Sequence, residues 1–190
     1  MFRCSGRVGL KRPDSRSGWV ALVVLVCYTA LVNLYDGIFF AHLTFHLVFF
    51  QILTEGLTGL WEELCFRGFL MTILRPCGVF GSVLISSAVF GLLHVDPTND
   101  FFQFGRFLVT ATLGLMFAVN RLQTNSILPA VIAHGAVNAV NDLFSDSDQS
   151  VDDSISTLNE EWILVLVSVP ILIYCFVTIR KNFSGWNERA

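Results

Sequence analysis

Two adjacent glutamates and an arginine stand inside an otherwise apolar stretch of this chain. The stretch from Gly59 to Leu70 reads GLWEELCFRGFL and contains Glu62, Glu63 and Arg67. A charge inside a membrane-spanning helix costs about 2.5 to 3.5 kcal/mol, so these side chains need compensation. On a helix Glu63 and Arg67 share a face, whereas Glu62 is rotated by about 100°. The spacing predicts a buried structural ion pair of Glu63 with Arg67, which leaves Glu62 to act as a base. The alternative is that all three side chains form a purely structural network.

A histidine ends the next apolar run. His94 follows Phe90-Gly91-Leu92-Leu93 and is separated by one residue from the polar residues 96–100. A histidine at this place can simply interact with the dipole of its helix. It can also carry a proton for a neighbouring carboxylate. Only the presence of Glu62 and Glu63 in the same chain favours the interpretation that His94 carries a proton.

A further apolar run, residues 127–143, carries His134 and Asn138 four residues apart. At this spacing both side chains lie on one face of a helix. Polar groups on an apolar helix need partners, and the small Gly135 and Ala136 would let another helix come close. The pair is either part of a site or a source of hydrogen bonds between helices.

The composition indicates that these helices lie in a membrane. The chain has 190 residues, of which 54% are hydrophobic and 14% charged, and its mean hydropathy is +0.64. These values predict an all-α, polytopic integral-membrane bundle. The formal charge of -3 without a broad basic face excludes a nucleic-acid binder. The five cysteines form no CxxC pair, so neither a structural zinc site nor a disulfide framework is expected.

The hydropathy pattern predicts a single membrane-embedded domain at 19–181, with its motif core at 59–143. A basic N-terminal segment, 1–18, precedes this domain, and a short tail, 182–190, follows it. An acidic stretch at 145–161 must lie outside the hydrocarbon, and we expect a solvated loop there. The expected membrane segments are 19–35, 37–53, 55–75, 78–94, 104–120, 126–144 and 161–180.

The basic residues at both ends of the chain favour the cytoplasm. Seven full crossings would separate the two ends. We therefore expect about six to seven segments, with one of them re-entrant or two short ones joined into a single crossing.

Taken in order, the three motifs resemble those of the CAAX protease and bacteriocin-processing family (CPBP, also called Abi) of intramembrane proteases, which includes the type II CAAX prenyl endopeptidases. The family pattern is EExxxR, then FxxxH, then HxxxN. One motif alone is weak evidence, but three in order at helical spacing are specific. The chain is short for the family, and its flanking segments carry no motif. The matching residues are Glu62, Glu63, Arg67, Phe90, His94, His134 and Asn138.

The resemblance implies a multi-pass peptidase in which Glu62 and His94 activate a water molecule, while His134 and Asn138 form an oxyanion hole. Glu63 and Arg67 would orient these groups. The implied substrate is a protein or peptide with a lipidated or hydrophobic C-terminal segment, held beside membrane lipid. We expect a prokaryotic cell membrane with the N-terminus in the cytoplasm. No cofactor is required on this interpretation, although zinc held by Glu62, His94 and His134 is an alternative.

Two further classes of protein could use the same polar residues. A non-catalytic scaffold or immunity protein would bind a chain without cutting it. A small proton-coupled transporter would relay protons through buried glutamate and histidine. The transporter interpretation predicts polar residues along a path across the bilayer and an inverted repeat, and the sequence shows neither.

Overall fold

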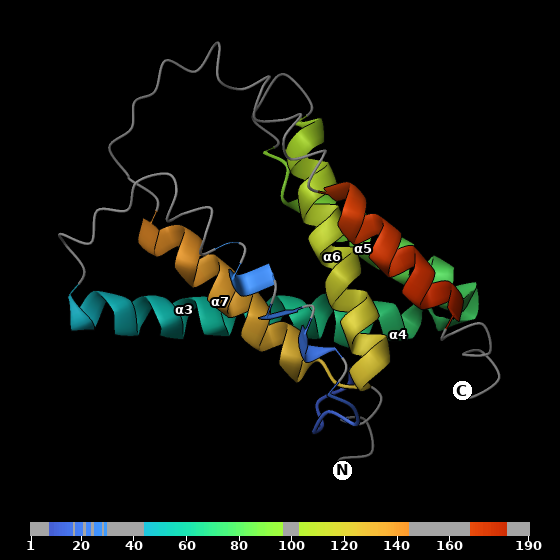
Figure 1. Cartoon of the computed structure of the whole chain (residues 1–190), viewed down its shortest axis with the longest axis horizontal. Coiled ribbons are helices and arrows are strands. Elements are labelled where there is room, and N and C mark those ends of the chain that lie inside the picture. Colours follow the sequence, from blue (N-terminus) through green and yellow to red (C-terminus); the bar gives the residue numbers. More distant parts are fainter. Residues whose placement is uncertain are drawn as a thin grey trace. The chain divides into compact units, whose positions relative to one another are not determined.

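The computed structural model describes residues 8–16, 18–20, 22–23, 25–27, 29, 44–96, 103–144 and 168–181. Every regular element among them is helical, which confirms the all-α prediction for this part of the chain (Figure 1). Described residues at 19–29 and 168–181 are helical as well. The longer helices are α3 (Phe45–Glu63), α5 (Gly78–Leu93), α6 (Phe104–Thr124) and α7 (Leu128–Phe144). Three short elements join α3 to α5: a π-helix (Leu64–Leu70), α4 (Met71–Ile73) and a 3-10 helix (Arg75–Cys77).

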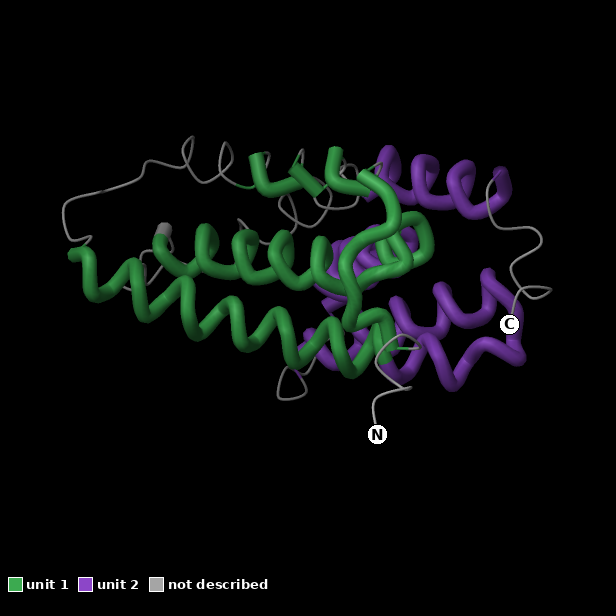
Figure 2. Tube along the Cα trace, turned by 90° about the horizontal axis from the view of Figure 1, so that it is seen from below, with its two compact units in different colours: residues 1–68, 120–149 green, residues 69–119, 150–190 purple. Residues whose placement is uncertain are grey.

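The chain divides into two compact units (Figure 2). The first comprises residues 1–68 and 120–149, and the second comprises 69–119 and 150–190. Of the candidate site residues, Glu62, Glu63, Arg67, His134 and Asn138 belong to the first unit and His94 to the second.

Helix α3 corrects one predicted boundary. It begins after Thr44, whose hydroxyl accepts a hydrogen bond from the amide of Leu47 at 3.3 Å, and it continues without interruption to Glu63. The expected break between segments 37–53 and 55–75 is therefore wrong. Gly56 is helical, and a Cβ atom on Gly135 of α7 would lie 3.0 Å from its Cα atom.

Helices α3 and α7 cross with their backbones close together (Figure 1). A Cβ atom on Gly59 would lie 3.0 Å from the amide nitrogen of Gly135, and one on Gly135 would lie 3.0 Å from the carbonyl oxygen of Glu55. Glycine suits both positions because a methyl group there would force the two backbones to move apart by a few tenths of an ångström. The predicted close approach through Gly135 is confirmed. Ala136 instead lines an apolar groove of about 200 Å³ beside Trp19.

Two other predicted breaks are confirmed. Pro76 lies in the 3-10 helix, and Gly78 then takes a φ of 77°. Asn125 takes a φ of 55° between α6 and α7, a left-handed conformation that asparagine tolerates better than most residues. Both breaks therefore follow from local backbone chemistry.

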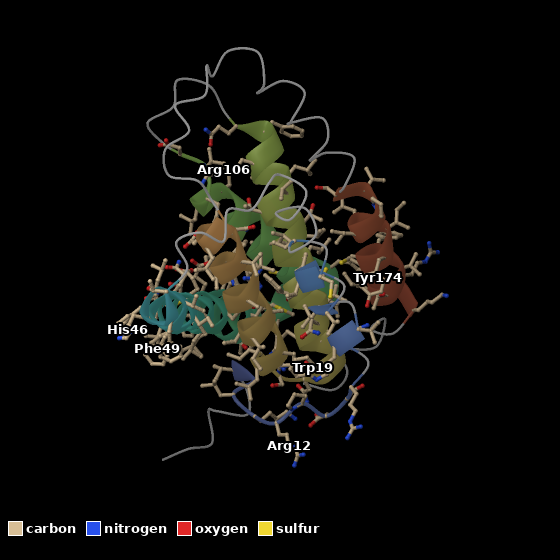
Figure 3. All side chains as sticks on the ribbon, turned by 60° about the vertical axis from the view of Figure 1, so that its left-hand side comes forward. Arg12, Trp19, His46, Phe49, Arg106 and Tyr174 are labelled. Atoms are coloured by element: carbon tan, nitrogen blue, oxygen red, sulfur yellow. The ribbon has the colours of Figure 1, made fainter. Side chains whose placement is uncertain are left out.

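The surface of α3 carries large apolar side chains. Phe45, Phe49 and Trp61 are 79%, 52% and 68% exposed, and Phe49 projects outward together with His46 (Figure 3). Large apolar side chains exposed in this number on one helix indicate a binding or membrane-facing region. Among the described helices, the one at Arg75–Leu93 is long and apolar enough to cross a membrane, with a mean hydropathy of 1.8.

Several predicted features lie outside the described residues. These are the acidic loop at 145–161, the tail at 182–190 and most of the polar stretch 96–100. The number of membrane crossings therefore stays a prediction.

Candidate active site

The end of α3 positions both glutamates. Glu62 and Glu63 occupy its last turn, and the chain then continues as a π-helix that carries Arg67. π-Helical turns are rare and occur frequently at functional sites. Glu63 is fully buried and the side chain of Glu62 is 22% exposed, so the neighbouring carboxylates have different surroundings.

Glu63 and Arg67 form the ion pair that their spacing predicts. Arg67 donates a hydrogen bond from Nη1 to Oε1 of Glu63 at 2.9 Å, and both side chains are completely buried. Burying two charges together is tolerated only when each has a partner. Removing either residue would leave the other as an uncompensated buried charge. The orienting role assigned to the pair stays a prediction.

His134 lies between the two glutamates. Its Nδ1 is 3.1 Å from Oε1 of Glu63, and its Nε2 is 3.7 Å from Oε2 of Glu62. Because an ionised carboxylate only accepts hydrogen bonds, Nδ1 must carry the proton. Glu63 therefore accepts a hydrogen bond from Nδ1–H of His134 and directs Nε2 toward Glu62. Sequence reasoning separated Glu62 from Glu63 by helical phase but did not find this bridge between them.

The contacts of α7 with α3 place His134. Gly59 and Gly135 let the two backbones meet one turn from the glutamates, and further along the crossing Gln51 donates a hydrogen bond to Asp142 at 2.6 Å. Asn138 follows His134 by one turn of α7 and is half-buried. A donor at this position could act together with His134 on one substrate atom.

His94 is held by its own helix. It caps α5, and its Nδ1 donates to the carbonyl oxygen of Phe90 at 2.7 Å, since a carbonyl can only accept. The two rings lie 4.4 Å apart between centroids. In the neutral imidazole, Nε2 is then left with a lone pair and can accept a proton. His94 belongs to the second unit, so its convergence with Glu62 stays a prediction.

Within the described part of the chain, no group of three or more histidine, cysteine, aspartate or glutamate side chains is arranged to hold a metal ion. The chemistry of His134 nevertheless fits a ligand, because a histidine that donates through Nδ1 to a carboxylate presents Nε2 to its surroundings.

The geometry on the first unit thus combines a partly exposed carboxylate, a histidine oriented by Glu63 and a buried ion pair, which together can move a proton. The family model described as type II CAAX prenyl endopeptidase Rce1-like matches residues 43–140, more than half of the chain. The chain belongs to this family of membrane-embedded peptidases, which confirms the CPBP resemblance. No curated protein and no solved structure matches the chain.

Proposed function

We propose that the protein is a multi-pass intramembrane endopeptidase. Its substrate would be a protein or peptide with a lipidated or hydrophobic C-terminal segment, cut at a peptide bond near the membrane surface. The observation that carries the proposal is the placement of His134 between a fully buried and a partly exposed glutamate. Family membership supplies the reaction class, and the exposed apolar face of α3 supports contact with lipid.

Charge balance supports specific roles for Glu62 and His134. Two carboxylates and the guanidinium of Arg67 leave one negative charge in an apolar setting, where one added proton restores neutrality. Before attack that proton resides on His134, so that its Nε2–H is a donor while Glu62 is an ionised base. A neutral His134 with Nδ1 protonated could not donate from Nε2.

The proposed reaction begins when Glu62 removes a proton from a water molecule, with His94 assisting through Nε2. The water oxygen forms a bond to the peptide carbonyl carbon, and the carbonyl oxygen becomes an oxyanion. Nε2–H of His134 and the side-chain amide of Asn138 stabilise that oxyanion. The carbon–nitrogen bond then breaks, and the proton held by Glu62 passes to the leaving amine.

The zinc alternative uses the same geometry differently. Glu62, His94 and His134 would hold the ion, which would polarise the carbonyl or lower the pKa of a bound water. His134 would then be neutral, with its Nε2 lone pair available to the metal and its Nδ1–H still bonded to Glu63. A chelator separates the two mechanisms, because it would abolish cleavage only in the zinc version.

The decisive experiment uses protein purified in detergent and a panel of prenylated and hydrophobic-tailed peptides. Glu62→Gln removes the base without changing its size, and Glu55→Gln is the matched control because Glu55 is another carboxylate on α3. We expect cleavage by the wild type and by Glu55→Gln, with a loss of at least about 100-fold for Glu62→Gln. Equal product from all three proteins would refute the role of Glu62, and no cleavage by the wild type would favour a scaffold or a transporter.

The orientation of the protein in the membrane is part of the proposal. We place the basic N-terminal segment in the cytoplasm of a prokaryotic cell, as the distribution of lysine and arginine favours. Protease accessibility of an N-terminal tag in sealed vesicles of known orientation would test this placement.

A further inference from the structure

The N-terminal segment makes ordered contacts with the turn before α7 and with the π-helix that follows α3. We call residues 8–14 the strap. They belong to the same compact unit as the glutamates and His134. The sequence suggested only a basic segment on the cytoplasmic side, yet the strap is held by backbone as well as side-chain contacts.

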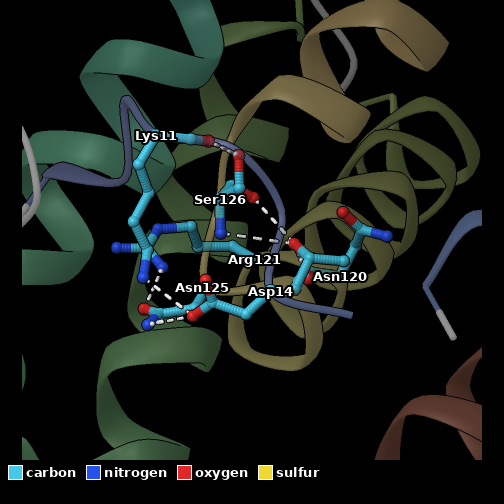
Figure 4. Close-up of polar contacts among 7 residues, drawn as sticks. Lys11, Asp14, Asn120, Arg121, Asn125 and Ser126 are labelled. Carbon is cyan, nitrogen blue, oxygen red and sulfur yellow. Dashed lines mark hydrogen bonds and ion pairs between the residues drawn. The ribbon is translucent and has the colours of Figure 1, made fainter. Parts of the chain in front are cut away.

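One end of the strap is fixed to the turn that leads from α6 into α7. The amide of Ile127 donates to the carbonyl oxygen of Gly9 at 3.0 Å, and the amide of Asp14 donates to the carbonyl oxygen of Thr124 at 2.8 Å. The hydroxyl of Ser126 donates to the carbonyl oxygen of Lys11 at 2.5 Å (Figure 4). These bonds hold the turn immediately before the helix that carries His134.

Side chains reinforce this junction. Asn125 donates its amide to Asp14 at 3.0 Å and accepts from the buried Arg121 at 3.1 Å (Figure 4). Gly9 has a φ of +83°, and a Cβ atom there would overlap the guanidinium group of Arg121. Both the conformation and the space therefore require glycine at this position. The left-handed turn at Asn125 is thus fixed from both sides.

The other end of the strap rests against the π-helix. A Cβ atom on Gly68 would lie 3.1 Å from the carbonyl oxygen of Val8. Gly68 directly follows Arg67, which pairs with Glu63. The strap therefore connects the residue next to the buried ion pair with the first residues before α7.

We infer that the strap is a positioning element, which sets the separation between the glutamates at the end of α3 and His134 on α7. The contacts of the strap lie just after α3 and just before α7, so the strap acts through these two helices. Small displacements of reacting groups slow a reaction strongly, since a shift of about 1 Å can reduce its rate by about 100-fold. The expected effect on kcat rests on the proposed function. The expected effect on the position of His134 does not.

Two variants loosen opposite ends of the strap. Asn125→Gly keeps a residue that adopts positive φ while removing both side-chain hydrogen bonds, and Gly68→Ala adds a methyl group against Val8. Lys11→Ala is the first control, because it removes only the exposed ion pair of Lys11 with Asp14. Gly56→Ala is the second, since a Cβ atom at Gly56 meets nothing within 4 Å.

The measurements are hydrogen exchange at the amides of Asp14 and Ile127, the NMR signal of the Nδ1 proton of His134, and steady-state kinetics. We expect faster exchange and a shifted proton signal in Asn125→Gly and Gly68→Ala. In the same variants kcat should fall by about 10- to 100-fold with KM little changed. Both controls should exchange no faster than the wild type and should keep its His134 signal and its steady-state kinetics.

Three results would overturn the inference. Unchanged exchange in both variants would mean that these contacts do not hold the strap. Faster exchange with an unchanged His134 signal would mean that these contacts hold the strap but that the strap does not position His134. An unaltered kcat in an active enzyme would lead to the same conclusion. If the wild type cleaves no peptide, the proposed function fails, whereas exchange and the His134 signal still decide the role of the strap.

Discussion

One oxygen atom of Glu63 accepts hydrogen bonds from both Arg67 and His134, at 2.9 Å and 3.1 Å. This shared acceptor joins a charge-neutralising pair within one helix to a histidine from another. The carboxylate of Glu63 is fully buried beside these two donors, whereas the side chain of Glu62 is 22% exposed.

The first prediction concerns the buried pair. Glu63→Gln leaves the guanidinium of Arg67 without its counter-charge, so we expect a loss of about 3 to 5 kcal/mol in the free energy of unfolding. Thermal unfolding in detergent measures the loss. The double variant Glu63→Gln with Arg67→Gln should lose less than the two single variants added together, because the charges depend on each other. Additive losses would contradict a coupled pair.

The second prediction tests the proposed oxyanion donor. Asn138→Ala should lower kcat by about 100- to 1,000-fold while KM changes little, because the lost hydrogen bond forms only as the oxyanion develops. Asn141→Ala is the matched control on α7, where Asn141 is exposed to the surroundings. A rise in KM alone would assign Asn138 to substrate binding.

The third prediction concerns the helix crossing. Gly59→Ala places a methyl group 3.0 Å from the amide nitrogen of Gly135, and overpacking of this kind costs about 1 to 3 kcal/mol. Gly56→Ala meets open space and should instead stabilise α3 by about 0.5 to 1 kcal/mol. The two melting temperatures should move in opposite directions from that of the wild type. Equal shifts would show that the helices are not in close contact at Gly59.

The fourth prediction is a pH dependence at the junction of the strap. Hydrogen bonds from Lys11 and then Asn125 hold the pKa of Asp14 below its ordinary value of 3.8. A lowered folded-state pKa means that the carboxylate stabilises the fold above the unfolded-state pKa, and that this contribution disappears as the pH falls through the folded-state pKa. The melting temperature of the wild type should therefore exceed that of Asp14→Asn near neutral pH, and the two should converge in acid below pH 3.8. A constant difference would exclude the charge of Asp14 as its cause.

Helical spacing was sufficient to predict the contacts within one helix. The pairing of Glu63 with Arg67 follows from a separation of four residues, because that separation stacks side chains on one face. The break at Asn125 was also predictable, since its cause is local.

Helical spacing could not predict the contacts between helices. The bond of His134 to Glu63 depends on how closely α3 and α7 cross, and this depends on Gly59 and Gly135. The strap contains no chemical motif, and its contacts depend on backbone groups that every residue has.

The hydrogen bond from His94 to the carbonyl oxygen of Phe90 has a consequence for how its motif tolerates change. Any residue at position 90 would supply that carbonyl, so the phenylalanine ring contributes packing. Substitution at Phe90 would therefore loosen the histidine ring without removing its acceptor. Inserting or deleting one residue between Phe90 and His94 would bring another backbone carbonyl to the fourth position before the histidine and move the phenylalanine ring away from it. Within this motif, the interval therefore sets the packing of the two rings rather than the hydrogen bond.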